Sequence, residues 1–509
     1  MLLKSNCRRF SPTEEESAVP SHSLKKLEQD VSTLAEAVRA EGAERMAAWS
    51  PWIEREAFRD SAANLAEYLA LRRRDVRPLQ RRLMAHGLSS LGRLESRVLP
   101  TLEAVGAVLA ALREHTDLEP APDEDDFFSG ERRLAERTEE ILGVSSPDRG
   151  VHLLVTCPTE AGDGPDFMLK LAGLGVEAVR INCAHDDAEV WQRMIDHAHA
   201  ASAATGRPMK ILMDVAGPKI RTGAIRPLDG HKRILQEERL AIAAPGRLGD
   251  APAGILAIEC TLPQALAAAK PGERVFIDDG KLGTVVEAIA DWGITVHVTA
   301  SPDEDGYKLK EEKGVNFPDT DFSIPALTEK DIEDLAFIAA NADGIEFSFV
   351  QSADDVAMLQ AELAKLRPDW QKLSLILKIE TTRAVTNLPE ILARAAGRQP
   401  TAIMIARGDL AVEIGFARLA EIQEEILWIG EAAQVPVIWA TQVLEHLIKK
   451  GYPSRGEMTD AAMSARAECV MLNKGPHLFA AITELNTLLS RMEENQYKKT
   501  PMLRKLMSW

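Results

Sequence analysis

The chain has 509 residues, of which 45% are hydrophobic and 27% are charged, and these values are typical of a folded globular protein. They exclude collagen-like, wholly disordered and coiled-coil-only classes, and the length suggests about three domains. With 60 basic and 78 acidic residues the formal net charge is −18, which disfavours general nucleic-acid binding.

The first part of the chain has the residue spacing of amphipathic helices. Apolar residues recur every three or four positions over 24–38 and again over 91–112. The stretch 117–130 (DLEPAPDEDDFFSG) then combines prolines with an acidic run, which is typical of a linker or exposed loop. We therefore expect residues 1–150 to be a helical N-terminal extension followed by an acidic linker.

After residue 150 the pattern changes to short apolar runs separated by helical stretches. This alternation predicts an α/β fold, a parallel (β/α)8 TIM barrel over 151–223 and 316–490. The eight predicted strands are HLLVT, EAVRIN, MKILMD, DGIEFSF, LSLILKIE, AIMIAR, VPVIWA and ECVMLN.

The connection after the third strand is much longer than the others. Its segment 224–315 contains strand-like pieces such as RVFIDDG and GITVHVTA between glycine-rich turns. We expect an inserted β-rich domain there. Residues 491–509 are expected to be a C-terminal tail.

Polar residues close several of the predicted strands, and barrel active sites lie where strands end. Arg180 and Asn182 end the second strand. Because they are two residues apart, both side chains point to the same side of the strand, where they could bind a phosphate. Lys378 and Glu380 end the fifth strand in the same way. Each pair could also be a structural ion pair or cap, but several such ends on one rim favour a functional site.

Charged residues that follow other strands extend this set. Asp409 follows the sixth strand, so Glu380 and Asp409 could supply two hard oxygen ligands to Mg²⁺ or Mn²⁺. Lys219 and Arg221 follow the third strand and add positive charge at the mouth of the barrel.

One further strand end carries a hydroxyl. Thr441 lies at the end of the seventh strand. Together the set is typical of phosphoryl transfer, in which positive charge stabilises the developing negative charge.

At these residues the sequence resembles the pyruvate kinases. The resemblance implies a barrel domain, a mobile inserted B domain, and transfer of the phosphoryl group of phosphoenolpyruvate to ADP. It extends in order over about 151–485 through VRINCAH, LMDVAGPKIRTG, FIDDGKLG, EEKGVNFPDTDFSIPALTEKD, LKIETTRAVTNLPEIL, IMIARGDLAVEIG and VIWATQVLEHL.

The resemblance also assigns roles, residue by residue. The catalytic residues carried over are Lys378, Arg180 and Thr441, to which the charge argument adds Lys219, and the metal ligands are Glu380 and Asp409. Substrate binding falls on Asn182, Ser348, Gly408, Asp409 and Thr441, and nucleotide binding falls on Arg221, His185 and Lys313.

Some positions depart from the family's pattern. Where hydroxyl-bearing ligands usually hold K⁺ near Asn182 and Asp214, this chain has Ala184 and Val215, and the usual glutamate of GPEIRTG is Lys219. We expect the Lys219 ammonium to lie near that spot, so that K⁺ is not required. The segments 156–159 and 473–477 also differ. We expect this chain to lack the family's C-terminal domain, and residues 1–150 have no recognised counterpart in the family. We therefore expect no activation by sugar phosphates that act through that domain.

Two other interpretations stay open at this point. The altered segments would suit another Mg²⁺-enolate enzyme on a similar barrel, such as an aldolase or a different phosphotransferase, whereas Lys313 and Arg221 speak against it. The third interpretation is a non-catalytic scaffold, which the complete charged rim disfavours.

The cysteines and the apolar runs bear on the location of the protein. The five cysteines are scattered without a CxxC pair, which fits a reducing cytosol. No apolar run reaches the ~18 residues of a membrane span, and the start of the chain turns polar too early for a signal peptide. We expect a cytoplasmic homo-oligomer whose partners are phosphoenolpyruvate or pyruvate and ADP or ATP, with no nucleic acid and no membrane.

Overall fold

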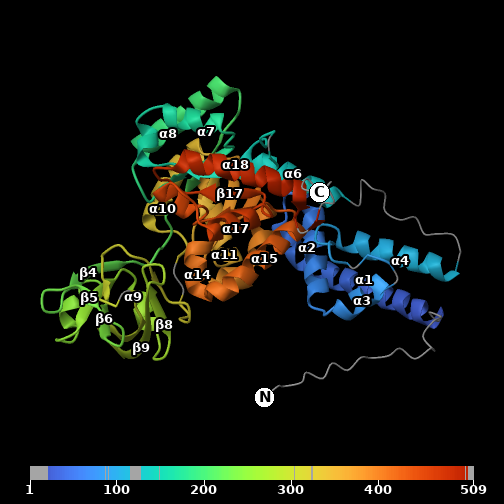
Figure 1. The fold of residues 1–509 in the computed structure, drawn as a ribbon. Coiled ribbons are helices and arrows are strands. Elements are labelled where there is room, and N and C mark those ends of the chain that lie inside the picture. The colour runs from blue at the N-terminus through green and yellow to red at the C-terminus, as the bar shows by residue number, and fades with distance from the viewer. Residues whose placement is uncertain are drawn as a thin grey trace, which may run out of the picture. The chain divides into compact units, whose positions relative to one another are not determined.

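The computed structural model describes residues 21–85, 87–89, 91–114, 128–147, 149–302, 304–322, 325–498 and 500–501. The chain divides into two compact units, Met1–Ala48 with Ala63–Gly130 and Trp49–Ala62 with Glu131–Trp509 (Figure 1). Most of the predicted acidic linker, 117–130, lies outside the described residues, and so does the predicted tail from 502 onward.

The N-terminal region is helical, as the apolar spacing predicts. Leu27 and Val31 of its first helix and Leu102 and Leu109 of its fourth are at most 1% exposed, because the apolar stripe of each helix faces the core. The helices are α1 (Ser21–Trp49), α2 (Arg59–Arg72), α3 (Arg77–Ala85) and α4 (Val98–Glu114), with 3-10 turns at Ser50–Trp52 and Glu56–Phe58.

The second unit contains a closed barrel of parallel strands, which confirms the predicted TIM barrel. All eight predicted runs form strands, and each helix that follows a strand returns the chain to the next one. The strands are β1 (His152–Thr156), β2 (Ala178–Asn182), β3 (Lys210–Asp214), β13 (Gly344–Phe347), β14 (Ser374–Ile379), β15 (Thr401–Ala406), β16 (Val437–Ala440) and β17 (Cys469–Leu472).

Helices surround these strands (Figure 1). Three of them start with a capping box, in which a Thr or Ser and an acidic residue three positions later satisfy each other's backbone N–H groups. The helices are α7 (Asp166–Gly173), α8 (Ala188–Thr205), α10 (Glu329–Asn341), α11 (Ala353–Leu366), α12 (Thr382–Thr386), α13 (Leu388–Ala396), α14 (Arg407–Ile414), α15 (Phe416–Ala433), α16 (Glu445–Lys450), α17 (Arg455–Ser464) and α18 (Leu478–Asn495).

Two segments that precede the barrel in the sequence pack against it. Helix α6 (Ser129–Leu142) buries Ile141 and Leu142 in the same apolar cluster as residues of the barrel interior. The segment 49–62 pairs its backbone with the barrel unit, since the Arg55 N–H donates to the Gly397 carbonyl at 2.6 Å. Part of the region before residue 150 therefore belongs to the barrel unit.

The insert after β3 forms a sheet with a core of its own. Leu240, Ile258, Val275 and Val296 are fully buried in that core. The sheet has the order β12-β8-β9-β10-β6-β7-β4, and β5 pairs with β11 beside it. The elements are β4 (Thr222–Arg226), β5 (Arg233–Ile234), β6 (Arg239–Ala243), β7 (Leu256–Cys260), α9 (Pro263–Ala268), β8 (Arg274–Ile277), β9 (Leu282–Ala290), β10 (Gly293–Ala300), β11 (Tyr307–Lys308) and β12 (Val315–Asn316).

The remaining features are small. A two-stranded hairpin of β18 (Gln496–Tyr497) and β19 (Thr500–Pro501) follows α18. Among the helices of the described residues, none has both the length and the apolar character needed to cross a membrane.

Candidate functional site

A cavity of about 210 Å³ opens at the carboxyl ends of the barrel strands. Its floor includes Met404 and Met471 of the barrel interior, and its walls carry most of the residues that the sequence singled out. Those residues are Arg180, Asn182, Lys219, Arg221, Ser348, Lys378, Glu380, Asp409 and Thr441.

Arg180 lies on β2 with its guanidinium held by two carboxylates. Its Nε donates to Glu346 Oε2 at 2.7 Å, one terminal nitrogen is bonded to Asp214, and the other lies 3.3 Å from Thr156 Oγ1. Burial opposes the charge of Arg180, but Asp214 and Glu346 more than offset this effect and raise its pKa. Arg180 is therefore a permanent, oriented cation at the cavity wall.

Lys378 lies on β14 within a cluster of polar atoms. Its Nζ is 2.7 Å from Ser348 Oγ, 3.2 Å from Asp214 Oδ1 and 3.4 Å from Glu380 Oε1. Burial disfavours its charge, but Asp214 and Glu380 outweigh burial and raise the pKa of Lys378. Lys378 therefore stays protonated, and its ammonium and the Arg180 guanidinium share Asp214.

The two predicted metal ligands face the same cavity. Glu380 is 3% exposed, and its Oε2 accepts a hydrogen bond from the Phe349 N–H at 2.6 Å. Burial raises the pKa of Glu380, and Lys378 offsets only part of that rise. Asp409 follows β15 at the start of α14 and accepts two hydrogen bonds from Lys219 Nζ, at 2.9 and 3.0 Å.

Two carboxylates on one wall fit a hard divalent cation, which prefers oxygen ligands. No group of three or more His, Cys, Asp or Glu side chains suited to a metal occurs within the described residues. A cation held by Glu380 and Asp409 would therefore complete its ligands from substrate and water oxygens.

The Lys219 ammonium hydrogen-bonds Asp409, whereas the sequence placed it near Asn182 and Asp214. All four residues line the same cavity, so its positive charge still lies in the site. Asn182 uses its Oδ1 to accept the Ala184 N–H at 3.0 Å, as a cap at the end of β2.

The loop after β16 is fixed against the start of α14. The Gly408 N–H donates to Thr441 Oγ1 at 3.0 Å, so this donor is already engaged by the threonine. Arg407 holds the same loop, because its side chain donates to the carbonyls of Ala440 and Thr441 at 3.0 and 2.6 Å and pairs with Asp460. Thr441 has φ of 64°, a left-handed backbone that these contacts maintain.

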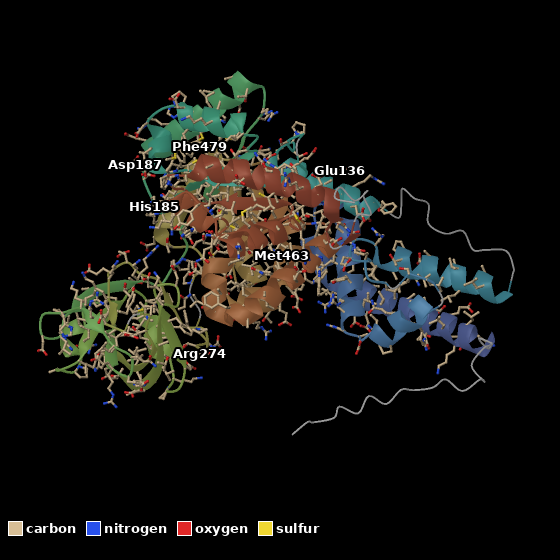
Figure 2. The ribbon with its side chains drawn as sticks, viewed as in Figure 1. Glu136, His185, Asp187, Arg274, Met463 and Phe479 are labelled. Atoms are coloured by element: carbon tan, nitrogen blue, oxygen red, sulfur yellow. The ribbon has the colours of Figure 1, made fainter. Side chains whose placement is uncertain are left out.

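The predicted nucleotide residues are spread more widely. Arg221 lines the cavity, and its guanidinium also donates to the Glu312 carbonyl at 3.0 Å. His185 is exposed in the loop between β2 and α8 (Figure 2). On the inserted domain, Lys313 pairs with Asp278 Oδ1 at 3.0 Å. Neither His185 nor Lys313 lines the 210 Å³ cavity.

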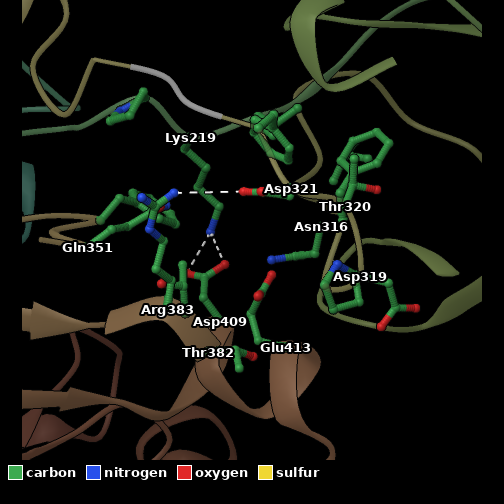
Figure 3. A pocket seen from close by; sticks show the side chains of 18 of the residues that line it. Lys219, Asn316, Asp319, Thr320, Asp321, Gln351, Thr382, Arg383, Asp409 and Glu413 are labelled. Carbon is green, nitrogen blue, oxygen red and sulfur yellow. Dashed lines mark hydrogen bonds and ion pairs between the residues drawn. The ribbon is translucent and has the colours of Figure 1, made fainter. Parts of the chain in front are cut away.

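A second cavity of about 510 Å³ adjoins the first and shares Lys219, Phe349 and Asp409 with it. Figure 3 shows Lys219 bonded to Asp409, and Arg383 paired with Asp321, among the side chains that line this cavity. Burial raises the pKa of Glu413, which lines this cavity, to about 7.

Sequence reasoning did not assign a role to three residues that build the site. Asp214 closes β3 and carried the same signal as the other strand ends, and Arg407 lies next to the assigned Gly408. Glu346 lies inside β13, in a run with no motif, and only its inward position in the strand alternation could have marked it.

Comparisons with known proteins agree with this geometry. The family model described as pyruvate kinase, barrel domain, matches residues 153–476. The pyruvate kinase of Mycobacterium tuberculosis is 29% identical over 344 residues, which cover 66% of this chain and 69% of that protein. The pyruvate kinase of Hypocrea jecorina is 33% identical over a region that covers 62% of this chain and 58% of that protein. The pyruvate kinase of Methylorubrum extorquens is 32% identical over a region that covers 66% of this chain and 67% of that protein.

Proposed function

The chain belongs to the pyruvate kinase family, and we propose that it transfers the phosphoryl group of phosphoenolpyruvate to ADP, giving pyruvate and ATP. The observation that carries this proposal is the gathering of Arg180, Lys378, Glu380 and Asp409 around one cavity at the carboxyl ends of the strands.

The proposed chemistry follows from charge. A transferring phosphoryl group and an enolate leaving group both develop negative charge, so catalysis is chiefly positioning and electrostatic stabilisation. Arg180 and Lys378 would supply fixed positive charge, because both pKa values are raised and both side chains are nine-tenths buried. Ser348 would hold the Lys378 ammonium in place through its 2.7 Å hydrogen bond.

Thr441 and Gly408 would act on the substrate's other end. The Thr441 hydroxyl lies at the cavity wall, where it would help to deliver a proton to the enolate carbon through water. The start of α14 would face the substrate carboxylate with its remaining backbone N–H groups, since a helix N-terminus favours an anion.

A divalent cation, Mg²⁺ or Mn²⁺, is part of the proposal. Glu380 and Asp409 would hold it, and when bound it would supply a positive charge that polarises the phosphoryl oxygens. Lys219 would then give up one or both hydrogen bonds to Asp409 and turn its charge toward the substrate.

The proposed activity does not require K⁺. A K⁺ site beside Asn182 and Asp214 fits poorly here, because Ala184 and Val215 carry no side-chain oxygen. The Lys219 ammonium would supply a tethered positive charge in the same cavity. Free K⁺ would then increase the activity only slightly.

Three further points stay predictions. They are nucleotide binding by Arg221, His185 and Lys313, a cytoplasmic location, and homo-oligomerisation. Arg221 precedes β4 and Lys313 precedes β12, at the two ends of the insert, and their positive charges would favour an anionic nucleotide on that side. The mass of the purified chain in solution tests the oligomer.

The test of the proposed activity is pyruvate formation from phosphoenolpyruvate, measured with and without ADP at saturating Mg²⁺. We expect pyruvate only when ADP is present. Pyruvate without ADP would indicate a different acceptor or an enolate enzyme of another class, and no turnover with any nucleotide would indicate a scaffold.

A further inference from the structure

Glu346 is a fully buried carboxylate in the interior of the barrel. It lies on β13, opposite Asp214 of β3 and Ile376 of β14 in the strand register, and its exposed fraction is 0%. Ile376, on one side, is apolar and belongs to the barrel core, whereas Asp214, on the other side, is an acid that lines the cavity. Glu346 therefore lies at the border between the charged strand ends and the apolar core.

The contacts of Glu346 are incomplete for a buried charge. Its Oε2 accepts the Arg180 Nε–H at 2.7 Å, but its Oε1 makes no hydrogen bond within the described residues. A buried carboxylate with an unpaired oxygen costs free energy, and an apolar residue of similar size is often the more stable choice. Stability alone does not explain this glutamate.

Glu346 and Asp214 together orient Arg180. The guanidinium is planar, so one carboxylate on Nε and another on a terminal nitrogen fix the plane of the group. The remaining terminal nitrogen reaches only Thr156, at 3.3 Å. Without Glu346 the arginine would keep Asp214 but could rotate about that single partner.

We propose that Glu346 is a positioning residue that aims the Arg180 guanidinium at the substrate phosphate and offsets part of its charge. This inference rests on the proposed function, because it assumes that Arg180 binds the phosphate of phosphoenolpyruvate.

The electrostatics around Glu346 support this role. Burial raises its pKa to about 7; Asp214 adds to the rise, whereas Arg180 and Lys378 lower it. The Cys469 thiol of β17 also faces this region, and burial raises its pKa well above 9.0, so it stays neutral. As the pH rises through about 7, Glu346 becomes ionised and neutralises more of the charge of Arg180. Phosphate binding should therefore weaken as the pH rises.

Two substitutions separate orientation from charge. Glu346→Leu removes the acceptor, and we expect kcat/KM for phosphoenolpyruvate to fall about tenfold or more, mainly through KM, because a hydrogen bond to a charged group is lost. Glu346→Gln keeps an oxygen that accepts from Arg180 Nε, so it should restore most of that loss.

The pH dependence gives an independent readout. Between pH 6 and pH 8 one group of pKa near 7 changes binding by at most about tenfold. We expect KM of the unmodified protein to rise over this range more than KM of Glu346→Gln, whose amide does not titrate. Ionisation of the substrate is common to both proteins and cancels in the comparison.

Glu177→Gln is the matched control. Glu177 is also a buried partner of an arginine, since both of its oxygens lie 3.0 Å from Arg149, but it lies at the opposite end of the barrel. It should lower the unfolding temperature without changing KM or its pH profile.

The outcomes distinguish the inference from the proposed function. If the unmodified protein transfers no phosphoryl group to ADP, the proposed function fails. If the protein is active but folded Glu346→Leu has the KM of Glu177→Gln, or the pH profile of Glu346→Gln matches the unmodified protein, the positioning role is wrong.

Discussion

Asp214 lies in contact with both buried cations of the site. Arg180 and Lys378 each contact it, and their charges hold its pKa below the usual range although burial acts in the opposite direction. An incoming phosphoryl group therefore competes with a carboxylate for two cations that are already in place, and it gains from them without waiting for side chains to reorganise.

The metal ligands give a prediction at this scale. Glu380→Gln or Asp409→Asn should shift the Mg²⁺ concentration for half-maximal activity upward by about tenfold or more and lower the maximum, because one anionic oxygen is lost. A titration of pyruvate formation against Mg²⁺ measures this.

Asp321→Asn is the control, since Asp321 is an exposed acid at the rim of the adjoining cavity. An unchanged Mg²⁺ titration in both Glu380→Gln and Asp409→Asn would rule out this ligand pair.

Lys219 gives a second prediction. The unmodified protein should reach full activity in buffers whose only monovalent cation is a bulky organic one, because its own ammonium lies in the cavity. Lys219→Glu should lose activity, and K⁺ should restore it poorly, since Ala184 and Val215 still offer no oxygen. Strong activation of the unmodified protein by K⁺, at constant ionic strength, would show that this interpretation of Lys219 is wrong.

Sequence patterns predicted the strand-end residues more readily than their contacts. Arg180, Lys378 and Glu380 were found because a strand has a period of two and barrel sites lie at strand ends. The bond from Lys219 to Asp409 joins residues 190 positions apart, and no local pattern encodes it. Glu346 was missed because a single glutamate in an apolar run forms no motif, and only its inward position in the strand alternation distinguishes it.

At the level of elements, the barrel strands were predictable and the order of the inserted sheet was not. Each barrel strand is a short apolar run that pairs with its neighbours in sequence, apart from the jump across the insert. In the insert β8 lies between β12 and β9, and β6 is parallel to β7, so the pairing depends on contacts that are distant in the sequence.

The first residue of β10, Gly293, allows a test of that sheet. Gly293 has φ of 148°, and a Cβ there would lie 2.2 Å from the Ile242 carbonyl oxygen of β6. Gly293→Ala should therefore destabilise the insert by more than about 2 kcal/mol, because neither backbone can move without breaking the ladder. Thermal unfolding followed by circular dichroism measures this.

Gly254→Ala is the comparison within the same domain. Gly254 also has a positive φ, 79°, but a Cβ there would meet nothing within 4 Å. It should cost only about 1 kcal/mol of backbone strain, the cost of a left-handed conformation for a residue with a Cβ. Equal destabilisation by the two substitutions would contradict the close approach at Gly293.

For the whole molecule, composition predicted a folded, acidic chain, and the helical N-terminal region was predicted from its apolar spacing. The division into two units was not predicted. The segment 49–62 and helix α6 belong with the barrel through long-range contacts; for example, the Arg137 side chain of α6 donates to the Gln434 carbonyl at 2.9 Å. Such contacts join residues almost 300 positions apart, and hydrophobic periodicity reports only on neighbours along the helix.

The central claim is that this cavity transfers a phosphoryl group from phosphoenolpyruvate to ADP, and the amounts of pyruvate and ATP formed test it most directly. Both products should be measured in parallel for the unmodified protein and for Lys378→Met, with circular dichroism to show that the variant is folded. We expect one ATP for each pyruvate from the unmodified protein and a rate at least about a hundredfold lower from Lys378→Met, because the lysine acts mainly on the developing charge. Pyruvate formed without matching ATP, or a folded Lys378→Met within tenfold of the unmodified rate, would contradict it.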